Sequence, residues 1–217
     1  MVVVTSVLLL VRHFRSEIYN FVITKMTAEW YALVLSQIPD GQHVIDVGIG
    51  TGLALVKNKQ LLVKKKIRVT GVDYDMDYVK NCRNNFEANG LSHVCTVHQA
   101  SIYDFTQGAP YDAAYFSGSL MIMPDKVQAL KHVSSLLKPG SKIYVTQTFE
   151  SHRNPWMEKV KPYLKYLTTI DFGSVTYESD FLSLVTEAGF QVETKQDIHS
   201  SISRASRLYI LTPKPKN

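Results

Sequence analysis

The chain has 217 residues, of which 45% are hydrophobic and 20% are charged, and it carries a net charge of +5. These values describe an ordinary soluble globular protein that is long enough for one domain with a full core. The two cysteines, Cys82 and Cys95, form no Cys-x-x-Cys pair and no cysteine–histidine cluster with zinc spacing. This excludes the usual zinc sites and favours free thiols in a reducing cytoplasm.

The N-terminal segment is apolar, but it does not have the pattern of a membrane span. Residues 2–11 read VVVTSVLLLV, whereas a span needs about 20 apolar residues. Arg12 and Arg15 follow this run, whereas a secretory signal carries its basic residues before it. We therefore favour a docked strand or helix, or a contact with a partner, over a membrane-surface anchor. Two apolar sets within residues 12–38 then show helical spacing: Phe14, Ile18, Phe21 and Val22, and Trp30, Leu33, Val34 and Ile38.

The segment His43–Gly52, HVIDVGIGTG, organises the rest of the chain. Val44, Ile45 and Val47 form a short apolar run that is typical of a strand buried on both faces. Glycines then follow at alternate positions, and a helix is expected over residues 53–66. A strand, a glycine-rich turn and a helix start form the first crossover of an open α/β sheet, in which the glycines let a ligand lie against the backbone.

The glycine spacing indicates which ligand this turn accepts. A dinucleotide-binding turn reads G-x-G-x-x-G. Here Leu53 stands at the position of the third glycine, and the glycine comes one residue early, at Gly52. This spacing argues against a nicotinamide dinucleotide.

An acidic residue ends the second expected strand, residues 67–72. Asp73 lies 21 residues after Gly52, where a carboxylate at the strand tip can accept hydrogen bonds from both hydroxyls of a ribose. The alternative is that Asp73 caps the helix that follows. Asp75 or Asp77 suits that role better.

The rest of the chain continues the alternation of strands and helices. Further strands are expected at 94–97, 111–116, 143–146, 190–194 and 206–212, and helices at 75–89, 126–138 and 178–188. Residues 150–175 break this alternation. We therefore expect one domain over 41–217 with a cap insert at about 150–175, preceded by a helical lid over 1–40.

Lysines and one arginine gather in and after the first crossover helix: Lys57, Lys59, Lys64, Lys65, Lys66 and Arg68. We interpret them as the solvated face and end of that helix, because cations suit a helix C-terminus. A surface for nucleic acid or an acidic membrane is the alternative. No aromatic residues interleave the run, which argues against a surface that stacks single-stranded bases.

Five motifs occur in the order found in class I S-adenosylmethionine-dependent methyltransferases, and the chain resembles this family over residues 40–212. They are D-x-G-x-G-x-G at 46–52, GVDYD at 71–75, the YDAAYF strand start at 111–116 with its loop, LLKPG at 136–140 and AGF at 188–190. The resemblance implies an α/β fold with a Rossmann-like, doubly wound sheet of seven strands, mostly parallel with an antiparallel last strand. It also implies an enzyme that uses S-adenosyl-L-methionine and releases S-adenosyl-L-homocysteine.

The resemblance assigns the methionine part and the ribose of this cofactor to the glycine turn. Gly48, Gly50 and Gly52 would present their backbone to the ligand. Asp46 would organise the turn or meet the ammonium group of the cofactor, directly or through water.

The ribose and adenine would be held by residues after the next strands. Asp73 would accept hydrogen bonds from the ribose hydroxyls, and Tyr74 would flank the adenine. Ser101 and Ile102 would lie at the adenine edge, and Ser117 would reach the cofactor from the loop after the fourth strand. Many family members carry Asp or Glu where this chain has Ser101, so its hydrogen bond would be weaker.

Methyl transfer is an in-line displacement at a methyl carbon on a positive sulfur. The site mainly needs to align acceptor and methyl within about 3–3.5 Å and to exclude water. A general base is needed only where the acceptor must lose a proton. No certain catalytic residue is therefore identified; His152 is a weak candidate base, and His199 a weaker one.

The acceptor pocket is expected to come from residues 14–31, 117–123 and 150–175. Its candidate lining residues are Tyr19, Trp30, Tyr31, Ser119, His152, Trp156 and Tyr163. Large aromatic side chains cover much area and fix the orientation of a ligand. Plain packing remains the alternative for each of them.

The family motifs also limit the acceptor. Methyltransferases that act on the amino groups of nucleic-acid bases or of protein glutamine carry Asn/Asp-Pro-Pro-Tyr/Phe after strand four, where this chain reads Ser117-Gly118-Ser119-Leu120. We find no carboxylate set for the divalent metal of catechol-type enzymes. We therefore expect an oxygen or nitrogen of a small molecule as acceptor, with no nucleic acid. A protein methyltransferase and a non-catalytic scaffold of the same fold remain as alternatives.

Overall fold

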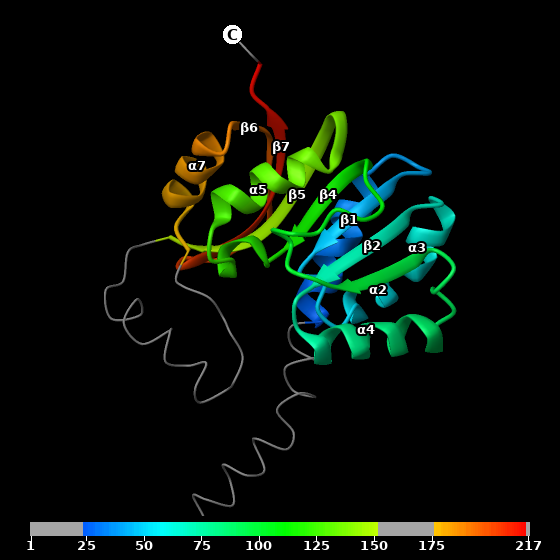
Figure 1. Cartoon of the computed structure of the whole chain (residues 1–217). Coiled ribbons are helices and arrows are strands. Elements are labelled where there is room, and N and C mark those ends of the chain that lie inside the picture. Colours follow the sequence, from blue (N-terminus) through cyan, green and yellow to red (C-terminus); the bar gives the residue numbers. More distant parts are fainter. Residues whose placement is uncertain (1–23, 152–175, 216–217) are drawn as a thin grey trace, which may run out of the picture.

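The structure is a computed structural model that describes residues 24–151 and 176–215 (Figure 1). Its seven-stranded sheet has the order β3-β2-β1-β4-β5-β7-β6. The pairs from β3 to β5 are parallel, and β7 is antiparallel to both β5 and β6. The doubly wound α/β sheet that the sequence predicted, with an antiparallel last strand, is confirmed.

The strands are β1 (His43–Val47), β2 (Arg68–Asp73), β3 (Cys95–Gln99), β4 (Tyr111–Ser117), β5 (Leu137–Glu150), β6 (Phe190–Ser200) and β7 (Arg204–Pro213). The helices are α2 (Leu53–Lys57), α3 (Lys59–Lys64), α4 (Met76–Ala88), α5 (Lys126–Ser135) and α7 (Glu178–Glu187), with a short 3₁₀ turn η1 (Leu120–Ile122). Residues 24–37 are also helical.

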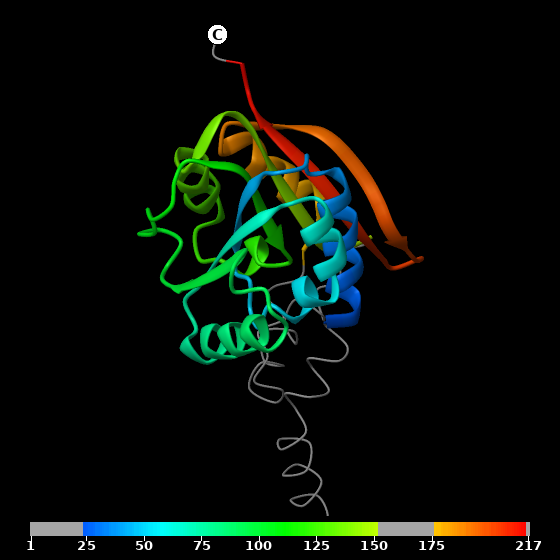
Figure 2. The ribbon, with the colours of Figure 1, turned by 90° about the vertical axis from the view of Figure 1, so that its right-hand side faces the viewer.

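Helices cover the sheet on both faces (Figures 1 and 2). The helix over residues 24–37 and helices α2, α3 and α4 share one hydrophobic core, which Val44 of β1 joins. Helices α5 and α7 share the other core with Ile45 and Val47. Because successive side chains of a strand point to opposite faces, the apolar run of β1 serves both layers.

β1 lies at the centre of the sheet, between β2 and β4. β2 and β3 follow β1 on one side of it, and β4 lies next to β1 on the other side. The order of the strands therefore reverses at β1. The carboxyl ends of β1 and β4 therefore flank the crevice in which open α/β sheets bind their ligands.

The first crossover differs from the single helix predicted over 53–66. It consists of α2 and α3, which meet at Asn58 with φ −103° and ψ 15°. The Asn58 amide donates to the carbonyls of Ala54 and Ala28, at 2.8 and 2.9 Å. The break thus tethers the helix 24–37, a contact that helical periodicity could not reveal.

The LLKPG segment also differs from the prediction. Helix α5 ends at Ser135, and Leu137 already pairs with Tyr111 as the first residue of β5. The segment therefore starts a strand where the sequence had suggested the end of a helix and a turn. β6 is also longer than predicted and extends to Ser200, because its outer part pairs with β7.

Two of the clustered lysines bind the ends of neighbouring helices. Lys65 donates to the carbonyls of Leu35 and Ser36, at 2.9 and 3.0 Å, where the helix 24–37 ends. Lys59 donates to the carbonyl of Asn89, just after α4. An ammonium group at a helix C-terminus satisfies carbonyls that lack a partner within the helix.

Within the described ranges, no helix is long and apolar enough to cross a membrane. The apolar residues 2–11 lie outside these ranges.

Candidate functional site

The glycine turn between β1 and α2 is built from residues in the left-handed region, with φ of 61° at Gly50 and 68° at Gly52. A Cβ on Gly52 would lie 2.7 Å from the sulfur of Cys82 and 2.9 Å from the ring of Phe86 on α4. A Cβ on Gly50 would meet nothing within 4 Å. Gly52 is therefore required by the packing of α4, whereas Gly50 leaves its backbone accessible to a ligand.

Asp46 is a buried carboxyl group in β1, next to the turn. Its Oδ2 accepts a 2.6 Å hydrogen bond from the Tyr31 hydroxyl, and its Oδ1 is buried without a partner. Burial raises the pKa of Asp46 to about 7, although the Tyr31 hydrogen bond opposes this rise. A buried acceptor without a partner is costly to the fold and points to a ligand that completes it.

Asp73 connects the tip of β2 to the glycine turn. Its Oδ2 accepts from the Gly50 amide at 2.9 Å, and its Oδ1 accepts from the Asp75 amide at 3.0 Å. Burial raises the pKa of Asp73 above its usual value, and these backbone hydrogen bonds oppose the rise. Asp75, and not Asp73, caps α4, since its side chain accepts from the amides of Asp77 and Tyr78.

A cavity of about 110 Å³ lies between the helix 24–37 and the glycine turn. Its lining residues are Thr24, Thr27, Tyr31, Gly48, Ile49, Gly50, Thr51, Ala54, Tyr78 and Ser117. Tyr31, which was expected to line the acceptor pocket, here lines the cavity at the glycine turn. Thr24 and Thr27 were missed, although their spacing of seven and four residues before Tyr31 puts all three on one helix face.

The remaining residues predicted to contact the cofactor have different surroundings. Tyr74 directly follows Asp73 and is 76% exposed. Ile102 is buried in the core on the side of α5. The Ser101 hydroxyl accepts from the Tyr103 amide at 3.3 Å.

Ser119, predicted to bind the acceptor, packs against the glycine turn. It is buried, and its hydroxyl donates to the carbonyl of Val47. A Cβ on Gly48 would lie only 2.6 Å from the Ser119 Cβ. The close contact holds the loop after β4 against the end of β1. Tyr19, His152, Trp156 and Tyr163 lie outside the described residues.

β5 and β7 project beyond the carboxyl end of β4. β4 ends at Ser117, opposite Thr146, whereas β5 continues to Glu150 opposite Arg204. A cavity of about 340 Å³ adjoins this projection. It is lined by Phe149, Glu150, Ser151, Tyr177, Glu178, Ser179, Ala205 and Arg207. No sequence motif indicated this cavity, since its walls come from three separate segments.

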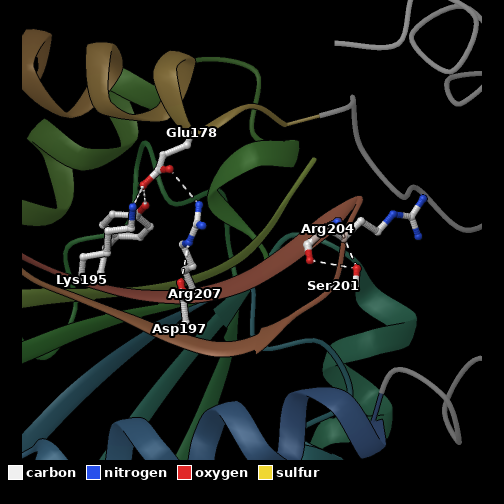
Figure 3. Close-up of polar contacts among 7 residues, drawn as sticks. Glu178, Lys195, Asp197, Ser201, Arg204 and Arg207 are labelled. Atoms are coloured by element: carbon white, nitrogen blue, oxygen red, sulfur yellow. Dashed lines mark hydrogen bonds and ion pairs between the residues drawn. The ribbon is translucent and has the colours of Figure 1, made fainter. Parts of the chain in front are cut away.

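Ion pairs fix the polar wall of this cavity (Figure 3). Glu178 accepts from Arg207 at 2.8 Å and pairs with Lys195 at 2.5 Å, and Arg207 also donates to Asp197 at 2.6 Å. Burial would raise the pKa of Glu178, but the hydrogen bonds of Lys195 and Tyr209 and the Arg207 charge hold it below its usual value. Glu178 is therefore ionised and a poor general base near neutral pH.

Among residues 24–151 and 176–215, no group of His, Cys, Asp or Glu side chains could hold a metal ion. His199, the weaker candidate base, is on β6 and bonds to Glu29 at 2.6 Å.

A family model described as a methyltransferase domain matches residues 38–202. The O-methyltransferase cnsE of Penicillium expansum is 28% identical over 170 residues, which are 78% of this chain and 59% of that protein. The chain thus spans less than two thirds of the length of this relative.

Two solved structures illustrate the shared fold. The mitomycin 7-O-methyltransferase MmcR aligns with a TM-score of 0.68 at 17% identity, over 89% of this chain and 54% of that one. A SAM-dependent methyltransferase from Geobacter sulfurreducens, solved with S-adenosyl-L-homocysteine, aligns with a TM-score of 0.63 at 13% identity, over 86% and 90%. The family match spans the glycine turn, Asp46 and Asp73 at the strand ends, and most of the sheet. The chain therefore belongs to the methyltransferase-domain family, which is the class I methyltransferase family that its motifs resemble.

Proposed function

We propose that the protein is an S-adenosyl-L-methionine-dependent methyltransferase that transfers a methyl group to an oxygen or nitrogen of a small molecule. One observation carries the proposal: an open glycine turn lies between two buried carboxyl groups, Asp46 and Asp73, in a methyltransferase-domain fold. The names of its relatives favour oxygen as the acceptor atom.

The described residues fit the cofactor. Asp46 Oδ1 is buried without a partner and would accept from the ammonium group. The space above Gly50 admits the ribose and methionine part, and Asp73 would turn toward the ribose hydroxyls. Tyr74 flanks the adenine in this proposal, with Ser101 and Ile102 at its edge.

When bound, the cofactor supplies a methyl group on a positive sulfur, which is an excellent leaving group. The protein then has to orient the acceptor, exclude water and leave the line of attack open. Ser119 and Gly48 hold the loop after β4 in place. The 340 Å³ cavity between α7 and the β5–β7 projection would receive the acceptor.

The proposal extends to the lid and cap segments, the cellular compartment and the class of acceptor. Residues 1–40 act as a lid and 150–175 as a cap, with Tyr19, His152 and Trp156 at the acceptor. The site lies in the cytoplasm, since both cysteines are buried and free, as a reducing compartment favours. Nucleic acid is not the acceptor, because the family motif for it is replaced at Ser117–Leu120.

The test is transfer of a labelled methyl group from the cofactor into the metabolite and protein fractions of a lysate. Label in small molecules, lost in an Asp73→Ala variant, supports the proposal. Label in protein alone would favour the protein methyltransferase, and binding of cofactor without any transfer would favour the scaffold.

A further inference from the structure

The hydrogen bond between Tyr31 and Asp46 joins the helix that covers the site to the strand that carries the glycine turn. It is 2.6 Å long and buried. It also divides the roles of the two carboxyl oxygens: Oδ2 accepts from Tyr31, and Oδ1 has no partner. The rotation of the carboxyl group is therefore set by a residue outside the glycine motif.

Tyr31 is itself held by contacts that do not involve Asp46. Its ring packs edge-on against Tyr115, with centroids 4.9 Å apart and planes at 83°. Tyr115 is in turn anchored by a 2.8 Å hydrogen bond to Thr146 on β5. The phenol therefore approaches Asp46 from a fixed direction.

The helix that carries Tyr31 is fixed along its length. Asn58 binds the carbonyl of Ala28, and Lys65 binds carbonyls at the C-terminal end. Two hydrogen bonds join it to β6: Gln37 donates to the Gln196 side-chain oxygen at 2.9 Å, and His199 bonds to Glu29 at 2.6 Å. These contacts come from separate segments and would persist if the Tyr31 hydroxyl were removed.

The surroundings of Asp46 contain acids and neutral groups. Five titratable groups interact with Asp46 through charge or a hydrogen bond: Tyr31, Asp73 on β2, Tyr115 on β4, Cys82 on α4 and Cys95 on β3. None of these described groups is a cation. An ionised Asp46 would therefore be stabilised best by a positive group that enters from the cavity lined by Tyr31 and Gly48.

We propose that Tyr31 is a positioning residue for the cofactor: it holds Asp46 so that Oδ1 meets the ammonium group of S-adenosylmethionine. This inference rests on the proposed function, and it reassigns Tyr31 from the acceptor pocket to the cofactor site. A Tyr31→Phe variant keeps the ring and loses only the hydroxyl. It removes a hydrogen bond that lowers the pKa of Asp46, so the carboxyl group should stay protonated to a higher pH.

The test is calorimetric titration of the wild type and of the Tyr31→Phe and Asp46→Asn variants with S-adenosylhomocysteine, from about pH 6 to about pH 9. Tyr144→Phe is the matched control, because Tyr144 is a buried tyrosine of the same core that lies on β5, separated from the Asp46 strand by β4. We expect Tyr31→Phe to bind roughly tenfold more weakly near neutral pH and to approach wild-type affinity at the alkaline end, where Asp46 ionises. Asp46→Asn should bind weakly throughout, and Tyr144→Phe should match the wild type.

An unchanged affinity and pH profile in Tyr31→Phe would overturn the inference, as would a loss of affinity that is equal at every pH. If the wild type does not bind S-adenosylhomocysteine at all, the proposed function fails, and the link between Tyr31 and Asp46 is tested separately on the unliganded protein. In the unliganded protein, the melting temperature should fall as the pH rises and Asp46 loses its proton. This fall should occur at a higher pH in Tyr31→Phe and should be absent in Asp46→Asn. An unshifted response in Tyr31→Phe would contradict the positioning role.

Discussion

Replacing Asp46 with asparagine should remove a large pH dependence from the stability of the unliganded protein. Burial raises the pKa of this carboxyl group from 3.8 to about 7. Between these values the folded protein holds a proton that the unfolded chain has released. The corresponding stability is complete below the unfolded pKa and is lost as the pH rises through the folded pKa.

The difference between about 7 and 3.8 is about 3 pKa units, which corresponds to about 4 kcal/mol of unfolding free energy. Asparagine does not titrate and retains an oxygen that can accept from Tyr31. We therefore expect the Asp46→Asn variant to gain up to about 4 kcal/mol relative to the wild type between about pH 4 and pH 8.

Urea unfolding of both proteins across this range measures the difference directly. Asp112→Asn is a control in which the pH dependence of stability should have the opposite sign. Burial would raise the pKa of Asp112, but the hydrogen bond and charge of Lys138 and the amide of His43 lower it. The stability that Asp112 contributes is present above its unfolded pKa and lost as the pH falls. A constant difference between Asp46→Asn and the wild type at every pH would refute the reasoning about burial.

Three further predictions concern the site. Asp73→Ala should weaken S-adenosylhomocysteine binding by roughly ten- to a hundred-fold, since a charged acceptor is lost; an unchanged dissociation constant in calorimetry would remove Asp73 from the cofactor site. Gly52→Ala should destabilise the protein more than Gly50→Ala. Both variants carry the cost of an alanine at positive φ, about 1–2 kcal/mol, but only the new Cβ at position 52 would clash with Cys82 and Phe86. Equal melting temperatures of the two variants would contradict this difference. Ala205→Trp should occupy part of the 340 Å³ cavity and reduce methyl transfer while cofactor affinity is kept; normal turnover would place the acceptor elsewhere.

The features that the sequence predicted well are those set by residues close together in the chain. The apolar run of β1, the left-handed glycines and the cap at Asp75 each depend on a few neighbouring residues. The alternation of such segments predicted an open α/β sheet, and the family resemblance implied its seven strands and the antiparallel last strand.

The features that were missed depend on contacts across the fold. The break at Asn58 is tied to Ala28, and the orientation of Asp46 is set by Tyr31. Helical periodicity predicted a helix around Tyr31, but it does not say which strand the Tyr31 hydroxyl meets. Ser119 looked open in a loop of small residues, yet its hydroxyl is bonded to Val47.

The projection of β5 and β7 was missed for a similar reason. Polar residues such as Gln147 and Glu150 follow the apolar run of β5, so the sequence predicted a strand that ended at residue 146. Pairing between the two strands, from Gln147 with Arg207 to Glu150 with Arg204, extends them beyond β4 and creates a wall of the 340 Å³ cavity.

The most direct test of the account is calorimetric titration of the purified wild-type protein with S-adenosylhomocysteine, with NAD as the comparison ligand. We expect saturable one-site binding of S-adenosylhomocysteine and no binding of NAD, because Gly50 leaves room for the ribose and methionine part while Leu53 replaces the dinucleotide glycine. Binding of NAD without any response to S-adenosylhomocysteine would contradict the central claim that the glycine turn, Asp46 and Asp73 form a methyl-donor site.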